Sequence, residues 1–133
     1  MFGSNVATRG DPPLNILVVD DDEMVLQVCR GMLSQLQHTC VCVSNAVEAI
    51  ELLTSSTELF DIIILDNLLP QLSGMDLFAI LREWNISIPV ILVSGMTPRA
   101  EVTGLAEHSF RFQFLAKPFS IAALGSAIKK TTL

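Results

Sequence analysis

The stretch ILVVDDDEMVLQ, residues 16–27, runs four apolar residues directly into four acidic ones before an apolar pattern resumes at Val25. An unbroken apolar run is typical of a parallel strand that is buried on both faces. The apolar residues after the acidic run recur at helical spacing, as in Val25, Val28, Cys29 and Met32, and predict the core face of a helix. The acidic residues therefore stand at a junction between a buried strand and a helix, where crowded carboxylates repel one another.

The same alternation of strand and helix continues along the chain. Strands are predicted over residues 15–20, 39–43, 60–66, 86–94 and 111–116. The last of these alternates like an edge strand, so Phe112 is expected to be half-exposed. Helices follow each strand, with start signals at Asp22, at Ser44 or Asn45, at Gly74, at Thr97–Pro98 and at Ser120. Five such units in order predict an α/β fold with a doubly wound, five-stranded parallel sheet. Residues 1–14 are expected to be a leader or linker, and residues 15–133 one domain.

Composition restricts the class of protein. The 133 residues are half apolar, the mean hydropathy is +0.53 and the formal net charge is −6. The acidic balance and the lack of a Lys/Arg-rich run argue against nucleic-acid binding by this domain. No apolar run approaches the roughly 18 residues that cross a bilayer, and no export signal opens the chain. We expect a soluble, cytoplasmic protein without membrane contact.

The three cysteines are expected to be reduced. His38, Cys40 and Cys42 would share one side of the strand at residues 39–43, because side chains alternate along a strand. A tetrahedral metal site there would still lack a fourth ligand, so packing as small apolar side chains is the favoured interpretation.

Polar residues cluster where the predicted strands end. In doubly wound sheets the ligand site lies outside the carboxyl ends of the strands. The residues found there are Asp20, Asp21, Asp22, Asp66, Ser94 and Lys117. Two unit charges at 4 Å repel by about 4 kcal/mol at an effective dielectric of 20, so a cation is expected among these carboxylates. Carboxylate oxygens with room for water suit Mg²⁺, whereas Asp22 is better placed to start the helix.

A partly hydrated Mg²⁺ beside a lysine and a hydroxyl describes a place for a phosphoryl group. Lys117 would neutralise its oxygens, Ser94 would donate a hydrogen bond, and a carboxylate oxygen of Asp66 would attack phosphorus. Phosphoryl transfer depends mainly on positioning and charge neutralisation, and aspartyl phosphates are established intermediates.

The segments ILVVDD, IIILDNLLP, ILVSG and FLAKPF together resemble the response-regulator receiver family of two-component signalling. They occur in family order with near-family spacing, and the likeness covers nearly everything from Asn15 onward. The resemblance implies a flavodoxin-like sheet with strand order 2-1-3-4-5. It also implies that Asp66 is the phosphoacceptor and that Lys117 and Ser94 assist it. Ser94 would hold the switch hydroxyl position and Phe114 the switch aromatic position.

The resemblance further implies a site for Mg²⁺ or Mn²⁺. Its ligands would be Asp21, Asp66 and the backbone carbonyl of Leu68, with Asp20 acting through water. The peptide between Lys117 and Pro118 would be cis.

A sensor histidine kinase or a histidine phosphotransfer protein would be the donor in a phosphorelay. Phosphorylation would change the surface formed by the helix after Pro98, the strand at 111–116 and the last helix, and a homodimer through this surface is left open. Leu68 and Met96 border the path of the hydrolytic water in this family. Because both are apolar here, we expect a long-lived phosphoryl group.

The favoured interpretation is a phosphorylatable signalling module that is not a conventional enzyme. Two alternatives to it remain. A phosphatase resembling the haloacid dehalogenase group would need an acidic residue two positions after the nucleophile, where this chain has Leu68. A pseudo-receiver that only binds proteins would be expected to lack one of the acidic or lysine positions, and none is missing. Neither G-x-G-x-x-G nor a P-loop is present, which argues against a nucleotide site.

Overall fold

The computed structural model describes residues 12–55, 59–95 and 111–132. The strands are β1 (Asn15–Val19), β2 (Thr39–Val43), β3 (Ile62–Asp66), β4 (Val90–Ser94) and β5 (Phe112–Ala116). They form one parallel sheet in the order β2-β1-β3-β4-β5, which confirms the predicted fold. The described helices are α1 (Glu23–Gln35), α2 (Ala46–Ser55), α3 (Gly74–Glu83) and α5 (Ile121–Thr132).

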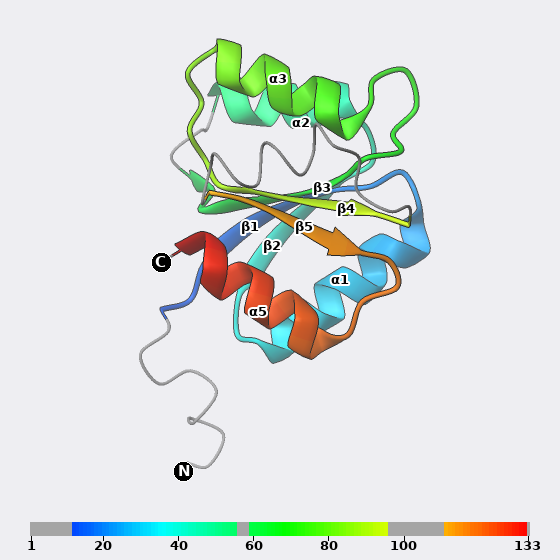
Figure 1. Cartoon of the computed structure of the whole chain (residues 1–133), viewed down its shortest axis with the longest axis vertical. Helices are drawn as coiled ribbons and strands as arrows, with labels where there is room; N and C mark the ends of the chain where they lie inside the picture. The colour runs from blue at the N-terminus through cyan, green and yellow to red at the C-terminus, as the bar shows by residue number, and fades with distance from the viewer. Residues whose placement is uncertain (1–11, 56–58, 96–110, 133) are drawn as a thin grey trace.

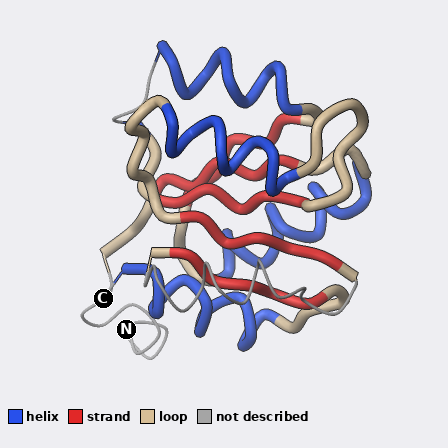
Figure 2. Tube along the Cα trace, turned by 45° about the horizontal axis from the view of Figure 1, so that its top comes forward, coloured by secondary structure: helices blue, strands red, loops and turns tan. Residues whose placement is uncertain are grey.

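The helices cover both faces of the sheet, with α1 and α5 on one face and α2 and α3 on the other (Figures 1 and 2). Each face has its own apolar core, one around Leu17, Ile63 and Leu92, the other around Ile16, Ile64 and Ile91. Every residue of β3 and β4 is buried. The unbroken apolar runs in the sequence follow from this burial on both sides.

Polar side chains cap the described helices at the predicted places. Asp22 accepts a hydrogen bond from the backbone N–H of Met24, and Ser73 forms a reciprocal capping box with Asp76. The Asn45 and Ser120 side chains accept from the N–H groups three residues later. Because each cap satisfies a backbone donor that the helix cannot, these residues fix where the helices begin. The predicted start at Thr97–Pro98 lies outside the described residues.

Three expectations differ from the structure. The strand predicted over residues 86–94 begins only at Val90, because Pro89 has no N–H to continue the ladder. Phe112, expected to be half-exposed on an edge strand, is fully buried and meets the ring of Phe78 edge-on at 4.8 Å. Val28, counted with the core face of its helix, is 52% exposed, and Leu26 is buried instead.

Backbone hydrogen bonds beyond the strand ends hold the rim of the sheet in place. The N–H groups of Asp20, Asn67 and Lys117 donate to carbonyls of the neighbouring strands, at 2.9–3.2 Å. Gly74 begins α3 directly against the end of β3, where a Cβ atom would stand 2.6 Å from the carbonyl oxygen of Asp66. Only glycine permits this approach, so the loop 67–73 is held close to the sheet.

No helix in the described part of the chain is long and apolar enough to span a bilayer.

Candidate phosphoacceptor site

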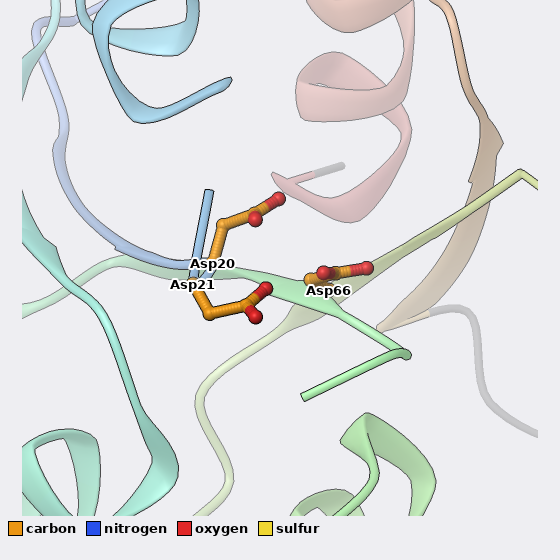
Figure 3. Close-up of side chains that lie close together, drawn as sticks. All are labelled: Asp20, Asp21 and Asp66. Atoms are coloured by element: carbon orange, nitrogen blue, oxygen red, sulfur yellow. The ribbon is translucent and has the colours of Figure 1, made fainter. Parts of the chain in front are cut away.

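Three carboxylates meet at the carboxyl ends of β1 and β3. Asp20 and Asp21 follow β1, and Asp66 is the last residue of β3. One ligand oxygen from each lies within 4.8 Å of the other two, and the side chains converge in Figure 3. Asp20 and Asp66 are buried, whereas Asp21 is exposed. The structure thus brings together the three acidic residues that the sequence selected.

Lys117 reaches this cluster from the end of β5. Its Nζ lies 3.0 Å from Oδ2 of Asp20 and 3.4 Å from Oδ1 of Asp66. Oδ1 of Asp20 also accepts the backbone N–H of Asp22 at 2.9 Å, so both oxygens of Asp20 are engaged. Asp21 makes no such contact within the described ranges.

Burial and charge act on the acid–base behaviour of the site. Desolvation raises the pKa of Asp66 above its ordinary value, and repulsion from Asp20 adds to this. The N–H of Leu68 and the ammonium of Lys117 lower the pKa of Asp66, but their effect is smaller than the increase that burial causes. Burial lowers the pKa of Lys117, yet its bonds to Asp20 and Asp66 raise it overall, so the lysine stays charged.

The donor set fits a hard divalent cation. Three carboxylates face a single ammonium, so the site carries excess negative charge. Carboxylate oxygens are the ligands that Mg²⁺ prefers, and an exposed residue such as Asp21 leaves room for the waters it keeps. Among the described residues this is the only acidic, His or Cys group of three with ligand atoms so close. His38 accepts the N–H of Leu14 through Nδ1.

The remaining predicted residues take these positions. Ser94 is buried at the end of β4, and its carbonyl accepts the N–H of Lys117. The Lys117–Pro118 peptide is cis, the isomer that the resemblance implied. Phe114 is half-buried against the core that contains Leu92. Leu68 is 63% exposed at the rim. Met96 lies outside the described residues.

Asn67 has a positioning role that the sequence did not reveal. Its side-chain oxygen accepts the N–H of Met75 at 3.1 Å, and its carbonyl accepts the N–H of Gly74. These bonds tie the loop after β3 to the start of α3. An amide beside an aspartate has many local partners available, so sequence alone gave no signal for this one.

An apolar groove of about 410 Å³ borders the site, also unforeseen. It is lined by Met24, Val25, Val28, Lys117, Pro118 and Phe119. Met24 and Val28 are 75% and 52% exposed, so α1 carries apolar side chains on its solvent side beside the lysine of the site. The sequence did contain a signal for this groove, because α1 has more apolar residues than one core-facing stripe requires.

A family model for the response regulator receiver domain matches residues 16–129. The chain belongs to this family. A receiver domain is a phosphoacceptor signalling module of two-component systems and not a conventional enzyme, and the pocket of Asp20, Asp21, Asp66 and Lys117 is that of phosphorylatable receivers.

Similar proteins agree with this assignment. The receiver domain is 30% identical over 113 residues to the response regulator MprA of Mycobacterium sp. (strain KMS), covering 84% of this chain and 47% of that protein. It is 30% identical to the sensor kinase CckA of Brucella abortus, over 86% of this chain and 12% of the kinase. The receiver domain of the Francisella response regulator 1452 superimposes with a TM-score of 0.75 at 30% identity, covering 90% and 94% of the two chains. The chain spans less than half the length of these two curated relatives.

Asp66→Asn should stabilise the metal-free receiver domain at neutral pH by roughly 0.5–2 kcal/mol. The folded state holds the Asp66 proton more tightly than the unfolded chain does, because burial raises this pKa. The contribution of Asp66 to stability therefore falls as the pH rises above the ordinary carboxyl value, a penalty that asparagine avoids. Urea unfolding with a chelator between about pH 4 and 7 measures the difference.

The advantage of Asp66→Asn should shrink towards the acid end of this range. It should also shrink when Mg²⁺ is added, because the metal stabilises the wild type by binding the folded state. A variant that is less stable than the wild type at neutral pH in chelator would contradict this account of the site.

Proposed function

We propose that Asp66 accepts a phosphoryl group from a phosphohistidine of a sensor histidine kinase or a histidine phosphotransfer protein in the cytoplasm, in a Mg²⁺-dependent step. The observation that carries this proposal is the meeting of Asp66 with an acidic pair and a lysine from three different strands of the sheet. Such a group has both a nucleophile and the means to neutralise a phosphoryl group.

The two oxygens of Asp66 are not equivalent. Oδ1 accepts the N–H of Leu68 at 3.2 Å and faces Lys117 at 3.4 Å. Within the described residues Oδ2 accepts no hydrogen bond. We assign Oδ2 as the attacking atom, which forms the new P–O bond while the N–P bond to the donor imidazole breaks and its electron pair stays on nitrogen.

The residues around Asp66 fit the charge changes of this transfer. Asp21, Asp66 and the carbonyl of Leu68 would hold Mg²⁺, with Asp20 bonded through water, and the ion would offset negative charge on the phosphoryl oxygens. Lys117 already spans Asp20 and Asp66, so its ammonium can move to a phosphoryl oxygen without leaving the pocket.

The response to phosphorylation is proposed to start at Ser94. This residue ends β4, and its hydroxyl would bond a phosphoryl oxygen. Phe114, on the neighbouring strand, would then turn inward by packing alone, because it has no hydroxyl. The surface that changes would include β5, α5 and the segment after Ser94, and a homodimer would form through the same surface.

The groove beside Lys117 is proposed to seat the phosphohistidine donor. A donor must bring its imidazole to the open oxygen of Asp66, so its surface has to touch the rim of the sheet. The groove lies on that rim, and the exposed Met24 and Val28 of α1 offer apolar surface for burial there.

Acetyl phosphate with Mg²⁺ should add one phosphoryl group to the wild type, detected by intact mass, and Asp66→Asn should abolish the gain. Asp22→Asn is the matched control, because asparagine keeps the helix cap that Asp22 provides and should leave labelling unchanged. A chelator should also prevent labelling. Equal labelling of Asp66→Asn and wild type would refute the assignment of the acceptor.

Val28→Glu should slow transfer from a phosphorylated histidine phosphotransfer protein by about tenfold or more, equivalent to about 1.4 kcal/mol. Its labelling by acetyl phosphate should be unchanged, because the chemistry at Asp66 is intact. The control is Val47→Glu, since Val47 is equally exposed (57%) but lies on α2, on the other face of the sheet. Docking in the groove would be ruled out if Val28→Glu slowed labelling by acetyl phosphate as well as transfer. It would also be ruled out if Val47→Glu slowed transfer as much as Val28→Glu does.

The apolar side chain of Leu68 should prolong the phosphorylated state, with Met96 acting alongside it. Leu68→Asn would offer a hydrogen bond to the hydrolytic water and should speed decay on the order of tenfold. Leu68→Met keeps the site apolar and should leave the lifetime unchanged. Decay is followed by intact mass after removal of the donor, and an asparagine variant no faster than the wild type would refute this role.

A further inference from the structure

The residue that follows the acceptor caps the amino end of α3. The first N–H groups of a helix have no partner within the helix, so groups outside it must bond them. The N–H of Gly74 donates to the carbonyl of Asn67, and the N–H of Met75 donates to Oδ1 of Asn67, both at 3.1 Å. The N–H groups of Ser73 and Asp76 are bonded within the capping box. Asn67 therefore supplies half of the cap of α3 from the end of β3.

Asn67 is also anchored to the sheet. Its own N–H donates to the carbonyl of Val93 on β4 at 2.9 Å, and its side chain is half-buried. The start of α3 lies directly against this backbone, since a Cβ atom on Gly74 would stand 2.6 Å from the carbonyl oxygen of Asp66 and 2.9 Å from Cα of Asn67. Asn67 is thus held between β4 on one side and α3 on the other.

The peptide group between Asn67 and Leu68 joins α3 to the acceptor. Its carbonyl accepts from Gly74, and its N–H donates to Oδ1 of Asp66 at 3.2 Å. A peptide group is planar, so a rotation that displaces one of these two groups displaces the other. The side chain of Leu68 is 63% exposed and does little to hold its own backbone, whereas the next residue, Leu69, is buried in the core. The backbone of Leu68 is therefore positioned by its two neighbours.

We propose that Asn67 is a positioning residue, whose side-chain oxygen orients the backbone of Leu68 towards Mg²⁺ and towards Asp66. The inference rests on the proposed function, in which the carbonyl of Leu68 is a ligand of the ion. Groups that hold a metal ligand in place from outside the coordination shell change the metal affinity by about 10–100-fold when they are removed. Without the oxygen of Asn67, the N–H of Met75 must turn to water, and the residues after Asp66 lose a tie to α3.

The test is isothermal titration calorimetry of the whole chain with Mg²⁺, without a phosphodonor. Asn67→Ala should bind Mg²⁺ about tenfold more weakly than the wild type. Ser73→Ala is the matched control, because Ser73 caps the same helix through the N–H of Asp76 and should leave the Mg²⁺ affinity unchanged. Urea unfolding in a chelator should show that both variants are folded and both less stable, since each has lost one cap. The Mg²⁺ affinity, not the stability, should therefore separate them.

Labelling by acetyl phosphate separates metal binding from the transfer itself. For Asn67→Ala, the Mg²⁺ concentration that gives half of the maximal rate should rise about tenfold. The rate at saturating Mg²⁺ should approach that of the wild type, because the nucleophile and Lys117 are intact. Asn67→Leu keeps the approximate size of the side chain without its oxygen and should behave as Asn67→Ala does.

Two results would overturn the role of Asn67 and leave the proposed function in place. One is a wild-type Mg²⁺ affinity in both Asn67→Ala and Asn67→Leu, and the other is an equal loss of affinity in Ser73→Ala. A wild type that binds no Mg²⁺ and gains no phosphoryl group would overturn the proposed function and this inference together.

Discussion

Three carboxylates share one ammonium group at the rim of the sheet, and the properties of the site follow from this excess of negative charge. Lys117 is bonded to Asp20 and Asp66, and Asp21 is left exposed beside them. Burial makes the imbalance costly, since desolvation is the main cause that raises the pKa of Asp66. A divalent cation relieves this cost, and a phosphoryl group brings negative charge back to Lys117 and the ion. The same excess of negative charge would therefore favour both the proposed Mg²⁺ binding and a response to phosphorylation.

The parallel connectivity of the fold brings these carboxylates together. The strands β1 and β3 are neighbours at the centre of the sheet, buried by helices on both faces, so their carboxyl ends place Asp20 and Asp66 together away from bulk water. Gly74 lets α3 approach the end of β3, and Asn67 ties the intervening loop to that helix. Close packing beside the acceptor would let a change of charge there act on neighbouring elements instead of being absorbed locally.

Sequence predicted the residues whose positions depend on strand ends. Asp20, Asp66 and Lys117 each follow an apolar strand, and parallel strands end at a common edge, so their meeting required no knowledge of side-chain packing. What depends on contact between elements was not predictable. Phe112 is buried and packs against Phe78 of α3, and on α1 Leu26 faces the core whereas Val28 is exposed. The role of Asn67 could be inferred only from the structure, which shows that its side-chain oxygen accepts the N–H of Met75.

Helix α1 connects the features on its side of the molecule. It starts at the cap residue Asp22, directly after the acidic pair, and carries Met24 and Val28 in the groove. A cation held at the acidic pair and a donor seated in the groove would therefore act on the same helix. If the cation displaces α1, linkage requires the effect to be reciprocal, so the cation and the donor change the affinity for each other by the same factor.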